Sequence, residues 1–249
     1  MGEPILSIER WLRTPLGAYL KAWEQDQCDA IVSDLFGYHA LQLGLPELQT
    51  LQSNRMPHRW LAVAHEPQNS EPIPEADNHN VIDFVTDYTA LPFFENSLDL
   101  LVLPHTLELS TDPHATLREA QRVLVPEGKL LICSFNPISL WGGKRWRQPD
   151  FIPEVGELIG NKRLKDWLKL LNFEIEISQF GCHRPAIQNE NWLNRFAWMD
   201  KLGKSSWSLF GAVHLLVAVK KVHGVRMMSP NWQAAKVKGV APVSIARKL

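Results

Sequence analysis

The chain has 249 residues, of which 45% are hydrophobic and 21% charged, and its formal net charge is −1 at neutral pH. These values are ordinary for a globular protein, and the length suits one α/β domain with an insertion. The longest clean apolar stretch, residues 211–219, is too short to span a bilayer. Charged residues interrupt the first apolar residues, so we expect no signal peptide.

Cysteine and histidine usage narrows the possibilities further. The 3 cysteines are odd in number and far apart. They predict neither a disulfide framework nor a metal site, and they favour a cytoplasmic protein kept in a reducing environment. The 9 histidines show no paired spacing of the kind that metal ligands have, so we expect no metal.

Charge is distributed unevenly along the chain. Residues 220–249 contain seven Lys or Arg and no Asp or Glu, so the remainder is acidic. Little periodicity and several Gly and Pro favour a flexible basic tail over residues 222–249. Such a tail could hold nucleic acid or an anionic membrane surface. The charge density is modest, so we favour a solubilising terminus over either partner.

The first elements expected are helices. Thr14-Pro15 provides a hydroxyl cap followed by proline at the first helical position. Residues 16–35 then follow helical spacing, after a shorter helix around residues 5–13. Residues 1–36 are therefore predicted to form an amino-terminal helical cap. Further on, residues 46–52 can make a short helix, and residues 66–80 read as a polar loop.

Seven apolar runs read as strands: residues 39–44, 60–64, 81–85, 100–103, 129–134, 174–180 and 211–220. Helical spacing separates several of them, around residues 117–124 and 163–171. Residues 181–208 hold four aromatic residues at irregular spacing and are predicted to be an insertion or lid before the last strand. Residues 1–221 then form one domain.

Continuous apolar strands joined through helices indicate a parallel sheet covered on both faces. We predict an α/β, Rossmann-like fold with a seven-stranded, mostly parallel sheet, helices on both faces and only the last strand antiparallel. In such sheets ligands bind at the carboxyl ends of the strands. Asp87 and the pair Pro104-His105 both follow apolar runs, so the site is expected there.

A series of short motifs occurs in one stretch of the chain. They are Asp87, Ala90-Leu91-Pro92-Phe93, Asn96-Ser97-Leu98-Asp99, His105, Asp112-Pro113, Arg118-Glu119-Ala120 and Pro126-Glu127-Gly128. In this order they resemble the second half of a class I S-adenosylmethionine-dependent methyltransferase, in the branch that includes the ubiquinone/menaquinone-biosynthesis enzymes. The resemblance implies S-adenosylmethionine as cofactor and a small or medium acceptor molecule.

The first strand departs from the family pattern. There the family has an acidic residue and a Gly-x-Gly-x-Gly turn whose bare backbone approaches the cofactor. At these positions this chain has Gln42 and only Gly44, and the residues that follow are Leu45 and Pro46. By position, Gln42 and Gly44 remain the candidates for cofactor contact at this strand.

The resemblance also implies the other cofactor contacts. Glu66 would accept hydrogen bonds from the ribose hydroxyls, although it could simply be the first polar residue of a loop. Asp87 would accept from the adenine amino group, with Tyr88 beside the ring. Pro104 and His105 would line the pocket near the transfer centre.

Residues at the ends of the fourth and fifth strands are candidates for catalysis and acceptor binding. His105 could act as a base, since its unperturbed pKa lies near ~6.5, or it could only shape the cofactor pocket. Asn136, Ser139 and Trp141 either line the acceptor pocket or merely turn the chain.

Three functions therefore stand side by side. The first is a methyltransferase for an unidentified acceptor. The second is a catalytically silent protein of the same fold that binds a ligand or partner, which the altered first turn favours. The third, prompted by the basic tail, is a nucleic-acid methyltransferase. The oligomeric state stays open.

Overall fold

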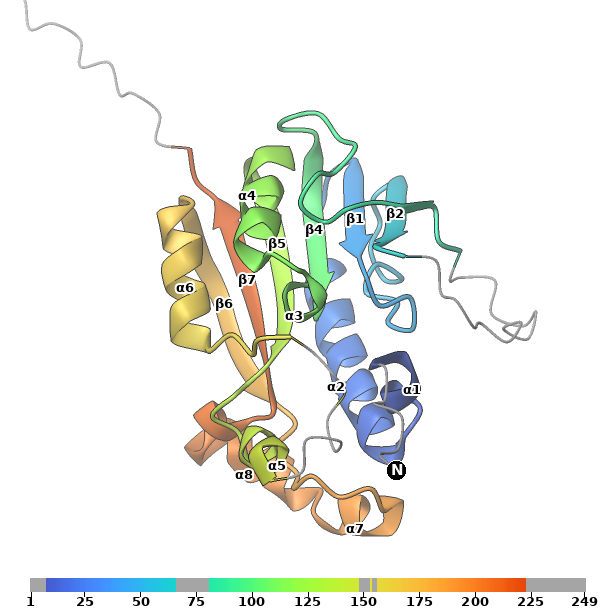
Figure 1. The fold of residues 1–249 in the computed structure, drawn as a ribbon, viewed down its shortest axis with the longest axis vertical. Helices are drawn as coiled ribbons and strands as arrows, with labels where there is room; N and C mark the ends of the chain where they lie inside the picture. The colour runs from blue at the N-terminus through green and yellow to red at the C-terminus, as the bar shows by residue number, and fades with distance from the viewer. Residues whose placement is uncertain (1–7, 66–80, 148–152, 154–155, 223–249) are drawn as a thin grey trace, which may run out of the picture.

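The computed structural model describes residues 8–65, 81–147, 153 and 156–222. Within them, seven strands form one sheet in the order β3-β2-β1-β4-β5-β7-β6 (Figure 1). The strands are β1 (His39–Leu43), β2 (His58–Val63), β3 (Phe84–Val85), β4 (Leu98–Pro104), β5 (Leu124–Phe135), β6 (Phe173–Gly181) and β7 (Val213–Lys220). Strand β7 is antiparallel to β5 and β6, and the other pairs are parallel. The predicted sheet is confirmed.

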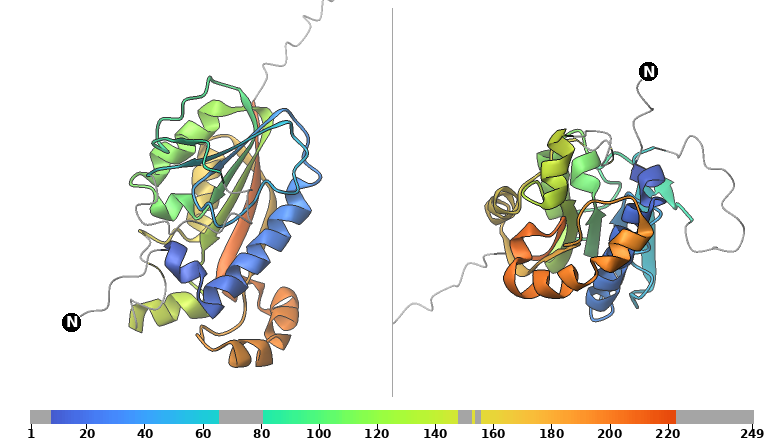
Figure 2. Two further views of the ribbon diagram at one scale, coloured as in Figure 1. Left: turned by 90° about the vertical axis from the view of Figure 1, so that its right-hand side faces the viewer. Right: turned by 90° about the horizontal axis from the view of Figure 1, so that it is seen from below.

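The helices are α1 (Ile8–Leu12), α2 (Pro15–Val32), α3 (Thr106–Leu109), α4 (Pro113–Val123), α5 (Leu140–Arg147), α6 (Asn161–Leu170), α7 (Glu190–Arg195) and α8 (Trp198–Ser206), with a 3₁₀ turn η2 (Ser208–Phe210). Helix α2 packs on one face of the sheet, and α4 and α6 pack on the other (Figure 2). Both faces are thereby covered, as parallel strands require.

Two helix starts follow from the sequence. The Thr14 hydroxyl accepts a hydrogen bond from the Gly17 amide at 3.1 Å, so α2 begins where the Thr-Pro pair predicts. The Asp112 carboxylate likewise accepts from the Ala115 amide at 2.9 Å and starts α4. These caps satisfy amides that have no partner inside the helix.

Two local expectations were wrong in detail. Residues 46–52 form turns instead of a short helix, and their main chain bonds to side chains: the Leu48 carbonyl and the Thr50 amide to Gln42, and the Gln49 main chain to Gln25. Strand β3 comprises only two residues, instead of the five that the apolar run at 81–85 indicated. Its edge position limits the pairing available to it.

The carboxyl ends of β1, β4 and β5 lie at the end of the molecule where α1, α5, α7 and α8 are found (Figure 1). We call this the cap end. Its apolar core joins α1, α2, α5 and α7 to the sheet through Trp11, Leu16, Leu45, Phe135, Trp141 and Leu193. No helix among the described residues is both long and apolar enough to cross a membrane. Glu66 and residues 223–249 lie outside the described residues.

Candidate functional site

The carboxyl ends of β1, β2 and β4 are tied together by short polar contacts. The Gly44 amide donates to the Ala62 carbonyl at 2.7 Å. The Thr106 hydroxyl, just after β4, donates to the Leu43 carbonyl. These contacts draw the first turns after the three strands into one region, at the edge where the sequence placed the site.

Gly44, like Leu45 after it with a φ of 42°, has the left-handed backbone shape of a glycine-rich turn. Its φ is +82°, a left-handed conformation that favours glycine. A Cβ at this position would lie 3.0 Å from the Tyr88 hydroxyl oxygen. That oxygen accepts a hydrogen bond from the Ala64 amide at 3.1 Å. Tyr88 is buried, and burial raises the pKa of its phenol. The tyrosine therefore covers Gly44 and bonds to the residue that follows β2.

Gln42 holds the turn that replaces the glycine-rich one. Its side-chain amide donates to the carbonyls of Gly44, Leu45 and Leu48 at 3.1, 2.9 and 2.7 Å. Its side-chain oxygen accepts from the amide and the hydroxyl of Thr50. The Gln42 side chain is buried, so these groups have no water to bind instead. A carboxylate could not donate these bonds, which accounts for glutamine at this position.

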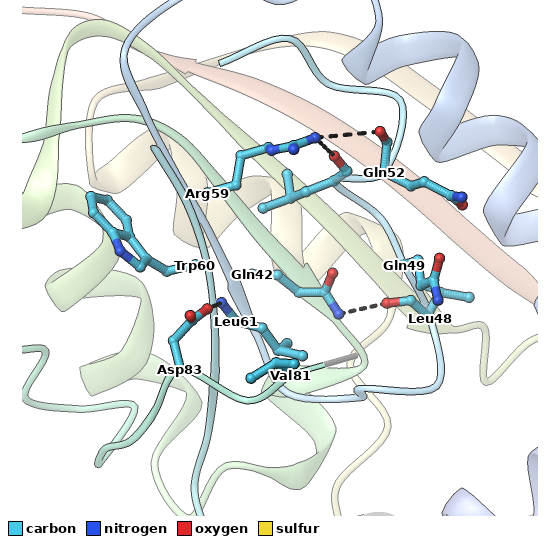
Figure 3. A pocket seen from close by; sticks show the side chains of 10 residues that line it. Gln42, Leu48, Gln49, Gln52, Arg59, Trp60, Leu61, Val81 and Asp83 are labelled. Atoms are coloured by element: carbon cyan, nitrogen blue, oxygen red, sulfur yellow. Dashed lines mark hydrogen bonds between the residues drawn. The ribbon is translucent and has the colours of Figure 1, made fainter. Parts of the chain in front are cut away.

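A pocket of about 320 Å³ lies beside this turn, against the middle of β1 and β2 (Figure 3). Its lining includes Gln42, Leu48, Gln52, Arg59, Leu61 and Asp83. The Arg59 guanidinium donates to the carbonyls of Leu51 and Asn54, so it supports the wall of the pocket. Gln42 is the one predicted cofactor contact in this lining, which does not include Gly44, Asp87, Tyr88 or His105.

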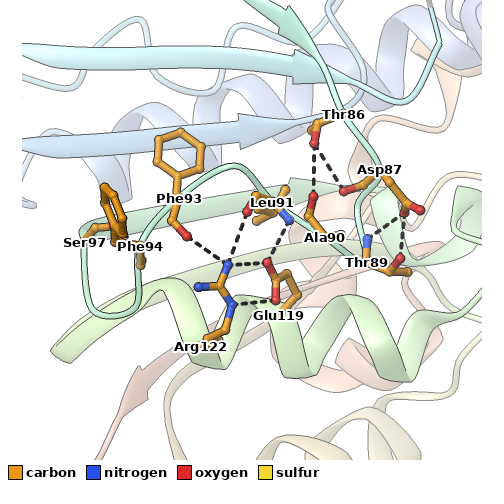
Figure 4. Close-up of polar contacts among 10 residues, drawn as sticks. All are labelled: Thr86, Asp87, Thr89, Ala90, Leu91, Phe93, Phe94, Ser97, Glu119 and Arg122. Atoms are coloured by element: carbon orange, nitrogen blue, oxygen red, sulfur yellow. Dashed lines mark hydrogen bonds and ion pairs between the residues drawn. The ribbon is translucent and has the colours of Figure 1, made fainter.

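Asp87 follows β3 and is exposed (Figure 4). One carboxylate oxygen accepts from both the amide and the hydroxyl of Thr89, each at 2.8 Å. The Thr89 amide and hydroxyl lower the pKa of Asp87, so the group stays ionised at neutral pH. The carboxylate is both held in place and accessible, as an acceptor for a ligand amino group must be.

The turn after Asp87 is fastened to α4 by an ion pair (Figure 4). Arg122 bonds to Glu119 through Nε and Nη2, at 2.8 and 2.6 Å. The same pair binds the main chain of Leu91 and the carbonyl of Phe93. Two motifs from separate parts of the sequence thus contact each other and fix the turn that carries Asp87.

His105 is fully buried, has a left-handed φ of 53° and lies between two carboxylates. Its Nδ1 is 2.7 Å from Glu108, and its Nε2 is 2.9 Å from Glu24 on α2. Burial by itself would lower the pKa of His105, but Glu24 and Glu108 outweigh it and raise the pKa to about 10. This geometry favours a protonated imidazolium in a buried network. A base role would require a neutral ring and one of these contacts broken, and it stays a prediction.

The three residues predicted for the acceptor pocket are buried, and their polar groups are bonded within the chain. The Asn136 amide donates to the carbonyls of Leu209 and Gly211, at 2.7 and 2.9 Å. Ser139 donates to the Asn136 carbonyl, and the Trp141 indole donates to the carbonyl of Arg184. These contacts favour the second interpretation, in which the residues turn the chain. Acceptor contact by them stays a prediction.

A second pocket, of about 410 Å³, lies at the cap end between the start of α2 and α7. Arg13, Tyr19, Arg184 and Leu193 are among its lining residues. The Arg184 guanidinium lies over the Tyr19 ring and bonds to Asp200 at 2.8 Å. Tyr19 donates to the same carboxylate. The network joins α2 to the insertion before β7.

Sequence reasoning missed Glu24 and Glu108. Glu24 lies four residues from both Leu20 and Cys28, on the buried face of α2, so an acidic residue inside that apolar stripe was the available signal. Glu108 lies three residues after His105, which puts both side chains on one side of α3. Among the described residues, no group of three or more potential metal ligands gathers.

The residues of this region suit the adenine part of an S-adenosyl group but not its methionine part. Asp87 offers an ionised, exposed acceptor suited to an adenine amino group. On the other side, the Tyr88 hydroxyl covers Gly44, and Leu45 packs into the apolar core of the cap end. The backbone that the methionine part would approach is therefore covered in this structure.

Comparison with known proteins gives a consistent result. A family model described as "Methyltransferase domain" matches residues 56–132. The chain is 32% identical over 225 residues to the "Uncharacterized protein YafS" of Escherichia coli (strain K12), covering 88% of this chain and 83% of that protein. It is 34% identical over 83 residues to a "Ubiquinone/menaquinone biosynthesis C-methyltransferase UbiE" of Cereibacter sphaeroides, of which it covers 33%.

Among solved structures, the fold is similar to a protein described as a putative methyltransferase, in complex with the Haloferax volcanii Trm112 methyltransferase activator. The TM-score is 0.60 with 16% identity, over 88% of this chain and 97% of that one. At this identity the match concerns the fold alone.

Proposed function

The chain belongs to the class I S-adenosylmethionine-dependent methyltransferase family, and on this premise we propose that the protein binds S-adenosylmethionine and methylates a small or medium acceptor. The observation that supports the proposal most is the state of the Asp87 carboxylate. Its ionised carboxylate is exposed after β3 and held by Thr89, at the position where the family binds the adenine amino group.

When bound, the cofactor supplies an activated methyl group. The chain would contribute mainly positioning, because methyl transfer needs the two reacting partners aligned. In this proposal Asp87 accepts from the adenine amino group and Glu66 from the ribose. His105, as an imidazolium fixed by Glu24 and Glu108, anchors the end of β4 and α2 beneath the site.

A catalytically silent ligand-binding protein of the same fold is the second candidate. The contact between Tyr88 and Gly44 favours it, because the hydroxyl occupies the space that the methionine part of the cofactor would need. Under the first proposal, Tyr88 has to leave Gly44 when the cofactor binds. The two candidates therefore differ in whether the covered turn opens.

Calorimetric titration of the purified protein with S-adenosylmethionine and S-adenosylhomocysteine tests the choice. The proposal expects saturable binding of both, and weaker binding by the Asp87→Ala variant. Asp166→Ala, an exposed carboxylate on α6, is the matched control and should bind like the parent. Absence of binding by the folded parent protein would reject the methyltransferase proposal and leave the silent candidate.

A further inference from the structure

The last part of the insertion before β7 exposes an unusual number of apolar side chains. They are Trp198, Leu202, Trp207, Leu209 and Phe210, each between 50% and 65% exposed. Trp198 and Leu202 lie four residues apart on α8 and share its outer face. The inner face of α8 is occupied by Asp200, which bonds to Arg184, and by Gly203, which packs against His183.

A second exposed apolar pair lies beside this segment. Ile138 and Leu140, in the turn from β5 into α5, are both more than half exposed. Asn136 joins this turn to η2, because its side chain bonds to the carbonyls of Leu209 and Gly211. We call these seven apolar residues, five from the insertion and two from the turn, the end surface. Figure 2 (right) looks onto this end of the molecule.

The charge of the cap end is opposite to that of the remaining body. Helix α5 and residues 181–210 together contain seven Lys or Arg and two Asp or Glu. The rest of residues 1–219 contains twelve basic and twenty-five acidic residues. Lys201, on the outer side of α8, is exposed next to Leu202, and Arg195 lies over the ring of Trp192. Basic side chains thus accompany the apolar end surface at the cap end.

We propose that the end surface docks the protein on an anionic lipid bilayer. Tryptophan, phenylalanine and leucine with neighbouring lysine or arginine suit the boundary between lipid headgroups and acyl chains. Anionic lipids attract basic residues close to the bilayer. An extended anionic surface also repels the acidic body, so it orients the whole molecule with the cap end toward the lipid. A small protein partner would contact only the end surface, so the charge of the acidic body would not orient it.

This orientation separates the end surface from the basic tail. Strand β7 runs antiparallel to β5, so Val222, the last described residue, lies at the opposite end of the sheet from the end surface. Exposed apolar residues at that opposite end have acidic neighbours: Phe36 follows Asp34, and Phe94 precedes Glu95. They provide matched controls that are apolar and more exposed, at 76% and 88%.

Flotation of the full chain with phosphatidylcholine vesicles, with and without phosphatidylglycerol, tests the proposal. We expect binding only to vesicles that contain phosphatidylglycerol, weakened by added salt. The double substitution Trp198→Ser and Leu202→Ser should lower the partition coefficient about tenfold or more, because two side chains no longer enter the lipid boundary. The control pair Phe36→Ser and Phe94→Ser should bind like the parent.

Three results would overturn the proposal. The folded parent could fail to bind anionic vesicles at low salt. The Trp198→Ser, Leu202→Ser variant could keep full binding, which would assign the vesicle contact to another segment such as the tail. Finally, sedimentation could show a dimer that the same two substitutions disperse while vesicles stay unbound, which would make the end surface a contact between two copies. Thermal melting of each variant confirms that it is folded.

Discussion

Glu24 and His105 are 81 residues apart in the chain, yet Oε1 of one lies 2.9 Å from Nε2 of the other. The contact joins the middle of α2 to the end of β4, and Glu108 completes it by bonding to Nδ1 and, through its other oxygen, to the Phe135 amide. All three side chains are buried. The helix of the cap is thus locked onto the sheet by a charged network that lies beneath the candidate site.

Replacing His105 by glutamine should destabilise the fold by about 3–5 kcal/mol near neutral pH, because two buried carboxylates lose their cation. The pKa of His105 is raised from 6.5 to about 10 in the folded state. A group whose pKa is raised by folding stabilises the folded state fully at pH values below its pKa in the unfolded chain. This stabilisation is lost as the pH rises through its pKa in the folded protein. The difference between parent and His105→Gln should therefore shrink between about pH 6.5 and 10.

Urea unfolding over this pH range measures the difference. His65→Gln, at an exposed position, serves as the control and should change the unfolding free energy little at any pH. A constant difference between the parent and His105→Gln from neutral pH to pH 10 would contradict a buried imidazolium.

His214 on β7 should behave in the opposite way. It is fully buried, and neither ring nitrogen has a hydrogen-bond partner among the described residues. Burial lowers the pKa of His214 to about 3, with the charges of His105 and Lys165 adding to the effect. A lowered histidine pKa means that the unfolded chain binds the proton first, so stability falls as pH drops below about 6.5 toward 3.

His214→Leu should remove this acid sensitivity and raise the unfolding free energy by about 1–3 kcal/mol at neutral pH, since two unpaired polar atoms leave the core. Thermal and urea unfolding between neutral and acidic pH provide the measurement. A variant less stable than the parent at neutral pH would show that the imidazole has a partner that this structure lacks.

Gln42→Leu should destabilise the protein by about 1–3 kcal/mol, because the carbonyls of Gly44, Leu45 and Leu48 lose their common donor in a buried site. Gln42→Glu should be worse, since a carboxylate would face three carbonyl oxygens. Gln49→Leu is the control, because Gln49 takes part in this turn through its main chain. Equal unfolding midpoints for Gln42→Glu and the parent would show that the turn has another organising contact.

Asp87→Ala should lower the affinity for S-adenosylhomocysteine about tenfold to a hundredfold, because a polar ligand group loses its acceptor at a cost of ~1–3 kcal/mol. Glu66→Ala should have a similar effect if the Glu66 carboxylate accepts hydrogen bonds from the ribose hydroxyls. Isothermal calorimetry measures both. Unchanged affinity in both variants, with binding by the parent intact, would place the cofactor elsewhere on the protein.

Local patterns in the sequence determined the strands and their order of appearance, and they indicated the region of the candidate site. Apolar runs and caps act over a few residues, so Thr14 could be recognised as the start of α2 and β4 as a buried strand. The motifs around Asp87 also indicated the family, because their residue types and spacing can be read from the sequence without knowing which residues are in contact. The position of Asp87 after β3 follows from the same local information.

Only the tertiary structure decided what these residues touch. Glu24 reaches His105 because α2 crosses the sheet. The Tyr88 hydroxyl reaches Gly44 because β3, which Tyr88 follows, and β1 lie on either side of β2. Each contact changes the chemistry of its partners. The contact with Glu24 favours the protonated form of His105, and the contact with Tyr88 covers Gly44. Burial and distance across the sheet set these properties, and a linear pattern carries neither quantity.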